Sequence, residues 1–326
     1  MSNFVRTIKS KNSYQYFFFK LCLFVFILFI IDFGVGNIFK VIYLKQKSGW
    51  DYRTKYAIED TKADILIFGS SRAQQQYNPV YFEDRLKASC YNVGRDGQVI
   101  LYQYPVLQAI LKRYTPKAII LECDNRMFID RKDAYERLSC LLPFYEKHPE
   151  IRAALQLKNS NEQIKLLSHM YPYNSTFFRI VQGVFKKEDE DIKGYVPLKG
   201  ALSEEIRQVD LDKSYKIDTN RIAFYKSFIA LCTKAGVKLV ITASPYFSKE
   251  LGNDTSLTIA KKIANENNIP FYDLSKGHLL LSKSNLFDDT AHVNQTGAKI
   301  LSNIVIDSIL INNNLKGTVF AFNTLK

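Results

Sequence analysis

Ala63-Asp-Ile-Leu-Ile-Phe-Gly69-Ser70-Ser71-Arg72 is the stretch from which the architecture of this chain can be worked out. Its first half is a short apolar run, which is typical of a parallel strand buried on both faces. The glycine that follows permits a tight turn, and serine is a preferred residue at the start of a helix. The stretch therefore predicts a strand, a turn and a helix in succession.

The same alternation continues along the chain on both sides of a central interruption. Predicted strands span 63–69, 89–94, 117–123, 237–243 and 269–273, and predicted helices span 79–87, 99–113, about 217–235, about 255–267 and about 295–311. Strand–helix alternation predicts a three-layer α/β/α sandwich with a mostly parallel central sheet. Residues 130–215 lose the alternation and carry two apolar helical patterns and a polar stretch, so we interpret them as a mainly helical insertion, able to act as a lid over a site.

The N-terminal region contains the most apolar segment of the chain. Its uncharged centre, Leu21 to Ile31, is eleven residues long, shorter than the roughly 20 residues that span a bilayer. Lys20 can extend its ammonium group to the headgroups, and Asp32 would then lie near the opposite interface. We predict a retained transmembrane signal anchor over residues 16–36. Basic residues on both sides leave its orientation open.

Three other interpretations of this segment are weaker. A core helix would not be apolar on every face and isolated before the domain. A cleaved signal peptide is poorly matched by Gly34-Val35-Gly36. A helix lying flat on the membrane needs a polar face, which this segment lacks.

The predicted organisation of the whole chain has five parts. They are a short basic tail (1–15), the anchor (16–36), a juxtamembrane linker (37–60), the α/β domain with its insertion (61–312) and a C-terminal tail (313–326).

Composition excludes several classes of protein. The 326 residues are 47% hydrophobic and 24% charged, which is ordinary for a globular chain and excludes a disordered or disulfide-knotted one. The formal net charge is +13, but no basic run with interleaved aromatics predicts a nucleic-acid partner. An anionic membrane surface and an anionic glycan are equally compatible with this charge. The five cysteines show no CxxC spacing, so no zinc site is predicted.

Polar residues follow the predicted strands where ligands bind in parallel α/β sheets, at the carboxyl edge. Ser71 follows the first strand, Gly97 the second and Asn125 the third, while Asp289 and His292 precede the last helix. Each position alone has a simpler explanation as a turn, a helix cap or a loop with an incidental histidine. Together they would meet at one edge of the sheet.

Each of these residues has a role in acyl transfer. Ser71 would be the nucleophile, His292 its general base and Asp289 the carboxylate that orients the imidazole. The backbone N–H groups of Gly97 and Ser71 would stabilise the oxyanion. Arg72 could hold an anionic sugar, although an exposed arginine beside a turn is the more common case.

These blocks, in this order, resemble those of the SGNH/GDSL hydrolase superfamily. The family's G-D-S block corresponds to Gly69-Ser70-Ser71, its N-x-G-x-x-G block to residues 92–97 and its D-x-x-H block to residues 289–292. The resemblance implies a flavodoxin-like fold and a serine-dependent ester hydrolase or O-acyltransferase with no metal or organic cofactor.

The third block of the family departs from the pattern in this chain. The family has G-x-N-D, whose Asn donates to the oxyanion, whereas this chain has Cys123-Asp124-Asn125. Either Asn125, displaced by one residue, completes the oxyanion hole with Gly97, or Asp124 occupies the position. A carboxylate there would repel an oxyanion.

A G-S-S-R block behind one anchor also resembles bacterial membrane-anchored members that modify envelope polysaccharides by O-acetylation or D-alanylation. This resemblance implies an extracytoplasmic domain with a cytoplasmic N-terminus, an acylated polysaccharide substrate and a membrane-bound acyltransferase as a partner. The N-terminal helix would bind the lipid bilayer, and no nucleic acid is expected. The main hypothesis is an esterase or acyltransferase that acts on O-acyl groups of a cell-surface or exported polysaccharide, with acetyl as the favoured acyl group. The alternative is a catalytically weak or inactive glycan-binding or assembly subunit, because the third block is altered.

Overall fold

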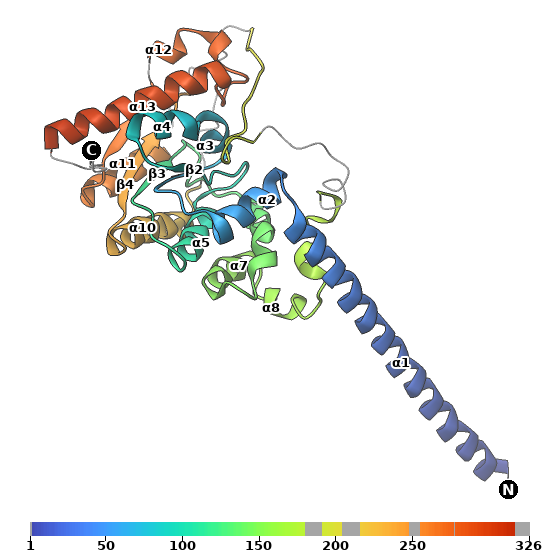
Figure 1. Cartoon of the computed structure of the whole chain (residues 1–326). Helices are drawn as coiled ribbons and strands as arrows, with labels where there is room; N and C mark the ends of the chain where they lie inside the picture. The colour runs from blue at the N-terminus through green and yellow to red at the C-terminus, as the bar shows by residue number, and fades with distance from the viewer. Residues whose placement is uncertain (1, 180–190, 204–215, 248–254, 277, 317–326) are drawn as a thin grey trace.

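The computed structural model describes residues 2–179, 191–203, 216–247, 255–276 and 278–316 (Figure 1). Its centre is a five-stranded parallel sheet in the order β2-β1-β3-β4-β5. The strands are β1 (Ile65–Phe68), β2 (Cys90–Asn92), β3 (Ala118–Glu122), β4 (Lys238–Ala243) and β5 (Phe271–Asp273). This is the flavodoxin-like order. The predicted fold class is confirmed, and each strand lies inside its predicted range.

Helices cover both faces of the sheet, as strand periodicity requires. Successive β1 side chains point to opposite faces, so Leu66 and Phe68 pack into one apolar core and Ile65 and Ile67 into the other. The first core is covered by α5 (Ile100–Leu111), α10 (Thr219–Lys234) and α11 (Thr255–Glu266), and the second by α3 (Ser71–Gln76), α4 (Pro79–Leu86) and α13 (Gln295–Lys316). The two layers of helices enclose the sheet as predicted.

The central insertion is helical in its described part, but its helices are shorter than the sequence patterns suggested. They are α6 (Lys132–Glu136), α7 (Arg152–Lys158) and α8 (Glu162–Lys165), with 3₁₀ turns at Arg137–Phe144, Pro149–Ile151 and Tyr171–Tyr173. Pro143 and Pro149 lack a backbone N–H, and proline interrupts an α-helix for that reason. Most of the polar stretch 186–193 lies outside the described residues.

The N-terminal segment is one long helix, α1 (Ser2–Lys45). Its part from Ser13 to Lys45 contains an 18-residue stretch with a mean hydropathy of 2.5 and is long and apolar enough to cross a membrane. Residues 13–31 are exposed along their whole length, about 28 Å of helix, which is close to the hydrocarbon thickness of a bilayer. The helix is therefore a candidate membrane anchor, although a signal sequence can have the same length and composition.

The domain first contacts α1 at Asp32. The Asp32 carboxylate accepts hydrogen bonds from Ser168 Oγ (2.5 Å) and from the backbone N–H of His169 (2.7 Å). A Cβ on Gly36 would lie 2.5 Å from the carbonyl carbon of His169, so the backbones of α1 and the insertion touch there. The helix thus passes from exposed to partly covered at Asp32, before the end of the predicted span 16–36.

The prediction that residues 37–60 form a juxtamembrane linker is wrong. Helix α1 continues to Lys45, α2 (Gly49–Lys55) follows, and a π-helical turn spans Tyr56–Asp60. Tyr43 and Ile58 are buried with exposures of 2% and 0%. Apolar side chains at these positions join the core of the domain, which a solvated linker would not do.

This packing predicts where the chain can be shortened. Removing residues 1–31 is expected to leave the free energy of unfolding almost unchanged. Removing residues 1–48 is expected to lower it by about 3–5 kcal/mol, because Tyr43 leaves a filled core. Urea unfolding followed by the fluorescence of Trp50 measures both. Equal midpoints for the two shortened chains would contradict a structural role for residues 32–48.

Candidate active site

The turn after β1 places two serines at the carboxyl edge of the sheet. Gly69 has φ +154°, and a Cβ there would lie 2.6 Å from the Cβ of Ala73 and 2.9 Å from that of Glu122. Only glycine fits this close approach of turn, helix and strand. Ser70 caps α3 by accepting a hydrogen bond from the backbone N–H of Arg72 (3.3 Å). Ser71 is the first residue of the helix and is partly exposed.

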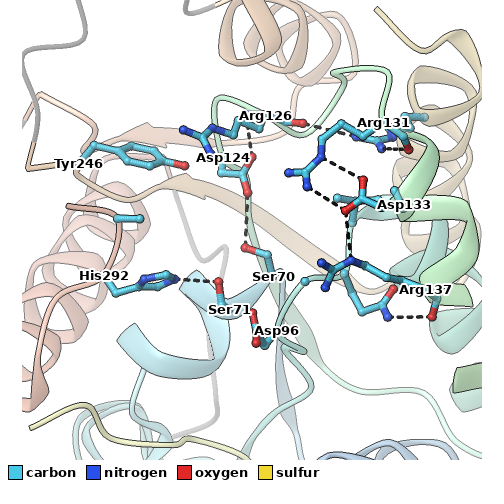
Figure 2. A pocket seen from close by; sticks show the side chains of 16 residues that line it. Ser70, Ser71, Asp96, Asp124, Arg126, Arg131, Asp133, Arg137, Tyr246 and His292 are labelled. Carbon is cyan, nitrogen blue, oxygen red and sulfur yellow. Dashed lines mark hydrogen bonds and ion pairs between the residues drawn. The ribbon is translucent and has the colours of Figure 1, made fainter. Parts of the chain in front are cut away.

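Ser71, His292 and Asp289 form a continuous hydrogen-bonded chain. Ser71 Oγ lies 2.8 Å from His292 Nε2 (Figure 2). The other ring nitrogen, Nδ1, lies 2.9 Å from Asp289 Oδ2 and 3.0 Å from Oδ1. Because a carboxylate can only accept, Nδ1 carries a proton toward Asp289 and the lone pair of Nε2 faces the Ser71 hydroxyl. The structure therefore brings together the three residues that the sequence singled out.

The loop before α13 orients the histidine. Asp289 Oδ1 also accepts hydrogen bonds from the backbone N–H groups of Ala291 (2.7 Å) and His292 (2.8 Å). Partial burial raises the pKa of Asp289, but the hydrogen bond and charge of His292 outweigh it and the pKa lies below its ordinary value. The side chain of Asp289 is 54% exposed and that of His292 only 18%. Asp289 is thus an ionised orienter at the rim, and His292 is the shielded base.

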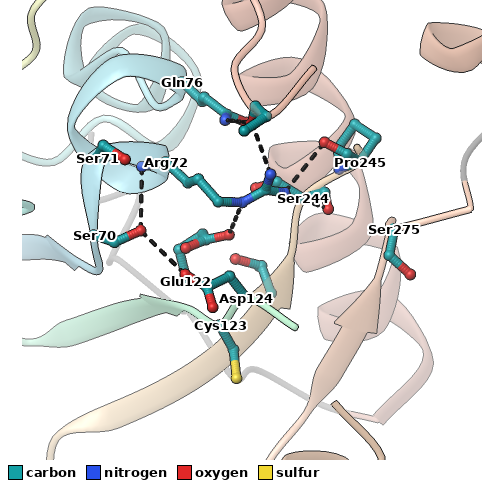
Figure 3. A network of polar contacts seen from close by, with 12 residues as sticks. Ser70, Ser71, Arg72, Gln76, Glu122, Cys123, Asp124, Ser244, Pro245 and Ser275 are labelled. Atoms are coloured by element: carbon teal, nitrogen blue, oxygen red, sulfur yellow. Dashed lines mark hydrogen bonds and ion pairs between the residues drawn. The ribbon is translucent and has the colours of Figure 1, made fainter. Parts of the chain in front are cut away.

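Arg72 fixes the loop before α13 through hydrogen bonds, a role that the sequence did not suggest. Its guanidinium donates to Ala291 O (2.7 Å) and to Ser244 O (2.6 Å), and its Nε donates to Glu122 Oε1 (3.0 Å) (Figure 3). The side chain is 3% exposed, so Arg72 is neither an exposed arginine beside a turn nor free to hold a sugar, and both interpretations are wrong. The first turn of α3 directs Arg72 between the ends of β3 and β4, where a carboxylate and carbonyls surround it.

Glu122 and Gln76 complete this support. Burial raises the pKa of Glu122 above its ordinary value and nearby Asp124 adds to the rise, while Arg72 opposes it. Gln76 Nε2 donates to Ala291 O (2.9 Å), the carbonyl that Arg72 also binds. Two side chains of α3 thus fix the residue next to His292. Arg72 is adjacent to Ser71 and Gln76 ends the same short helix, but only the fold shows what they reach.

The loop after β2 is hydrogen-bonded to α3 through Asn92 and lines the pocket with Gly97. Asn92 Nδ2 donates to the carbonyls of Ala73 (2.7 Å) and Tyr77 (2.8 Å), which ties this loop to α3. Gly97 has φ +69° and lines the same pocket as Ser71. Within the described part of the chain, the N–H of Gly97 donates to no protein acceptor. It is therefore available for the oxyanion role predicted for it.

The loop after β3 places Asp124, and not Asn125, at the pocket. Ser70 Oγ donates to Asp124 Oδ2 (3.4 Å), and the backbone N–H of Arg126 donates to Oδ1 (2.7 Å). Asp124 and Arg126 line the pocket, whereas Asn125 between them is 4% exposed and does not. A tight turn beginning at Asp124 turns the intervening side chain away. An oxyanion role for Asn125 stays a prediction that this arrangement does not favour.

The pocket beside Ser71 is small and rich in arginine. Its volume is about 180 Å³. Four arginines line it, and two of them share one carboxylate, with Arg131 at 2.8 Å and Arg137 at 3.3 Å from Asp133 Oδ2. The arginines are Arg126, Arg131, Arg137 and Arg221. They come from the loop after β3, the start of the insertion and α10, so no local sequence pattern connected them with Ser71.

A scan against protein-family models and a search of curated proteins found no match. Among solved structures, the chain is similar to the acetyl xylan esterase AlAXEase, with 14% identity over 75% of this chain and 99% of that one and a TM-score of 0.39. It is also similar to the psychrotrophic esterase EstA from Pseudoalteromonas sp., with 12% identity over 77% of this chain and 98% of that one and a TM-score of 0.39. A third similar structure is an acetylxylan esterase from Geobacillus stearothermophilus, with 11% identity over 82% of this chain and 97% of that one and a TM-score of 0.40. At these scores the similarities carry no functional inference for this chain.

Proposed function

We propose that this chain is a serine-dependent ester hydrolase or O-acyltransferase of the SGNH/GDSL type. One observation carries the proposal, namely the hydrogen-bonded chain Ser71–His292–Asp289 at the carboxyl edge of a parallel sheet. Nucleophile, base and orienter are each within hydrogen-bond reach of the next, which is the geometry that activates a serine. The motif order in the sequence supports the same family.

The reaction follows from these contacts. Ser71 Oγ attacks the acyl carbonyl while His292 Nε2 accepts its proton, and Asp289 stabilises the imidazolium through Nδ1–H. The backbone N–H groups of Ser71 and Gly97 stabilise the oxyanion. One such donor raises kcat by about 10²- to 10³-fold. His292 then protonates the leaving alcohol. The acyl group passes from Ser71 to water in hydrolysis or to another hydroxyl in transfer.

We propose that the substrate is an O-acyl group on a cell-surface or exported polysaccharide, and that the acyl group is acetyl. The anchor-like helix α1 supports a location at a membrane. The charged and hydroxyl side chains that line the pocket beside Ser71 support a substrate with polar groups around its ester. In the transfer case, a membrane-bound acyltransferase would supply the acyl group. The domain would lie on the extracytoplasmic side, with the N-terminus in the cytoplasm.

A second candidate is a catalytically weak or inactive subunit that binds or positions a glycan. The position of Asp124 favours it, because a carboxylate at the pocket opposes the negative charge that develops on the carbonyl oxygen. This candidate predicts a folded chain whose Ser71 does not react with an acyl-like electrophile.

The test is the reaction of the full chain in detergent with an aryl acetate and with a serine-directed fluorophosphonate. We expect the wild type to be labelled and to turn over. Turnover and labelling rate are expected to fall about 10³-fold or more in His292→Ala, because the serine loses its base.

Asp289→Asn is the matched variant for this test. This variant keeps the imidazole but removes the carboxylate that sets its tautomer, so turnover and labelling rate are expected to fall by about 10²- to 10⁴-fold. Circular dichroism checks that both variants fold. A folded wild type that neither turns over nor takes the label would favour the second candidate.

A further inference from the structure

A second pocket adjoins the pocket of Ser71. The two share Asp96, Gln98 and Arg137 as lining residues, so the second begins where the first ends. Its volume is about 130 Å³. Trp50 of α2 and Arg179 of the insertion line it in addition. A chain-like substrate with its ester at Ser71 would therefore extend past Arg137 toward Trp50.

Two arginine pairs beside this pocket each share a single carboxylate. Arg95 Nη2 lies 3.1 Å from Asp51 Oδ1, and Arg179 Nε lies 3.2 Å from Asp51 Oδ2. Arg131 and Arg137 share Asp133 in the same way. One guanidinium charge is left over in each group. The side chains of Arg137 and Arg179 are 47% and 39% exposed, so both can reach a ligand.

Trp50 presents an indole ring to the same pocket, beside Arg179. The residue is 41% exposed, and the Arg179 guanidinium lies 5.9 Å from the ring centroid. Its backbone is fixed, because Arg95 Nη1 donates to Trp50 O (2.8 Å). An exposed aromatic face beside polar groups suits a sugar ring, which has an apolar face and a polar edge. Trp50 lies beyond the end of α1, about 20 Å of helix from Asp32, so the hydrocarbon of a bilayer does not explain its exposure.

We propose that the second pocket binds an anionic sugar unit next to the acylated unit of the substrate. The carboxylate or phosphate of that unit would pair with Arg137 and Arg179, and its ring would stack on Trp50. Asp96 and Glu136 also line this pocket, but Glu136 pairs with Lys158 (3.5 Å), so guanidinium charge exceeds carboxylate charge there. The inference rests on the proposed function and adds to it that the glycan is acidic.

Trp50 is the only tryptophan of the chain, so its fluorescence reports on this pocket alone. The full chain in nanodiscs is titrated with tetragalacturonate as the carboxylate probe, mannose 6-phosphate as the phosphate probe and xylotetraose as the neutral probe. We expect a saturable change with an anionic probe that weakens as salt is raised. Arg179→Gln is expected to weaken that binding about tenfold, as for the loss of one charge-assisted hydrogen bond.

Lys55→Gln is the matched control, because it removes the same charge from α2 without lining the pocket. Its affinity is expected to stay within about threefold of the wild type. Equal responses to xylotetraose and to the anionic probes would overturn the proposal, as would equal losses in Arg179→Gln and Lys55→Gln. Quenching of Trp50 by brominated lipids would place the ring in the bilayer and also overturn it.

Labelling of Ser71 is read in the same preparation. A labelled chain whose Trp50 responds to no anionic probe would overturn the second pocket and leave the proposed function standing. A chain that binds the anionic probe without being labelled would support the pocket and turn the function toward a binding subunit. A response to mannose 6-phosphate and not to tetragalacturonate supports the pocket and assigns a phosphate as the anion.

Discussion

Ser71→Ala is expected to abolish fluorophosphonate labelling and to reduce aryl acetate turnover by about 10⁴-fold or more. The reason is that, among the residues the structure describes, Ser71 supplies the hydroxyl that contacts the base, with its Oγ 2.8 Å from His292 Nε2. Loss of the nucleophile in such a triad removes nearly all covalent catalysis and leaves only binding and oxyanion stabilisation. Initial rates of acetate release and intact-protein mass spectrometry after labelling measure the two effects.

Ser70→Ala is the matched control for this prediction. Ser70 is the adjacent serine in the same turn, but its hydroxyl caps α3 and donates to Asp124. Its loss is expected to lower the free energy of unfolding by about 1 kcal/mol, as for a helix cap, and to leave labelling in place. If Ser70→Ala abolished the label and Ser71→Ala did not, the assignment of the nucleophile would be wrong.

Arg72→Met is expected to have the largest effect on stability of any substitution near the site. Arg72 and Glu122 are 3% and 1% exposed and form an ion pair of 3.0 Å. Removing one partner of a buried pair leaves the other charge without compensation and costs about 3–5 kcal/mol. Urea unfolding of the full chain in detergent, followed by Trp50 fluorescence, measures the loss. The rate of fluorophosphonate labelling is expected to fall as well, because Ala291 O, next to His292, loses a hydrogen-bond donor.

A second substitution separates lost packing from buried charge in this prediction. Glu122→Gln in the Arg72→Met background removes the uncompensated carboxyl group and is expected to recover most of the lost stability. Labelling is not expected to recover, because the Ala291 carbonyl still lacks the guanidinium. A double variant no more stable than Arg72→Met would show that the ion pair is not the source of the effect.

Much of the fold was predictable because its determinants are local. Apolar runs such as 65–68 and 118–122 are buried strands for reasons visible within a few residues. Asn78 caps α4 with Pro79 at its first position, as such pairs do in many helices. The linker over residues 37–60 was mispredicted for the opposite reason. Nothing within the segment shows that Tyr43 and Ile58 meet the core of a domain far along the chain.

Periodicity and short spacing were enough to predict the alternation that makes the parallel sheet, the anchor-like helix and the candidates Ser71, His292 and Asp289. The folded chain was needed to show that these three residues meet, that Arg72 is buried beside them, and that Asp124 reaches the pocket while Asn125 does not. The arginines that surround the two pockets come from separate elements of the chain. Their proximity depends on how the insertion packs against the sheet edge, and such long-range packing leaves no pattern in the residues on either side.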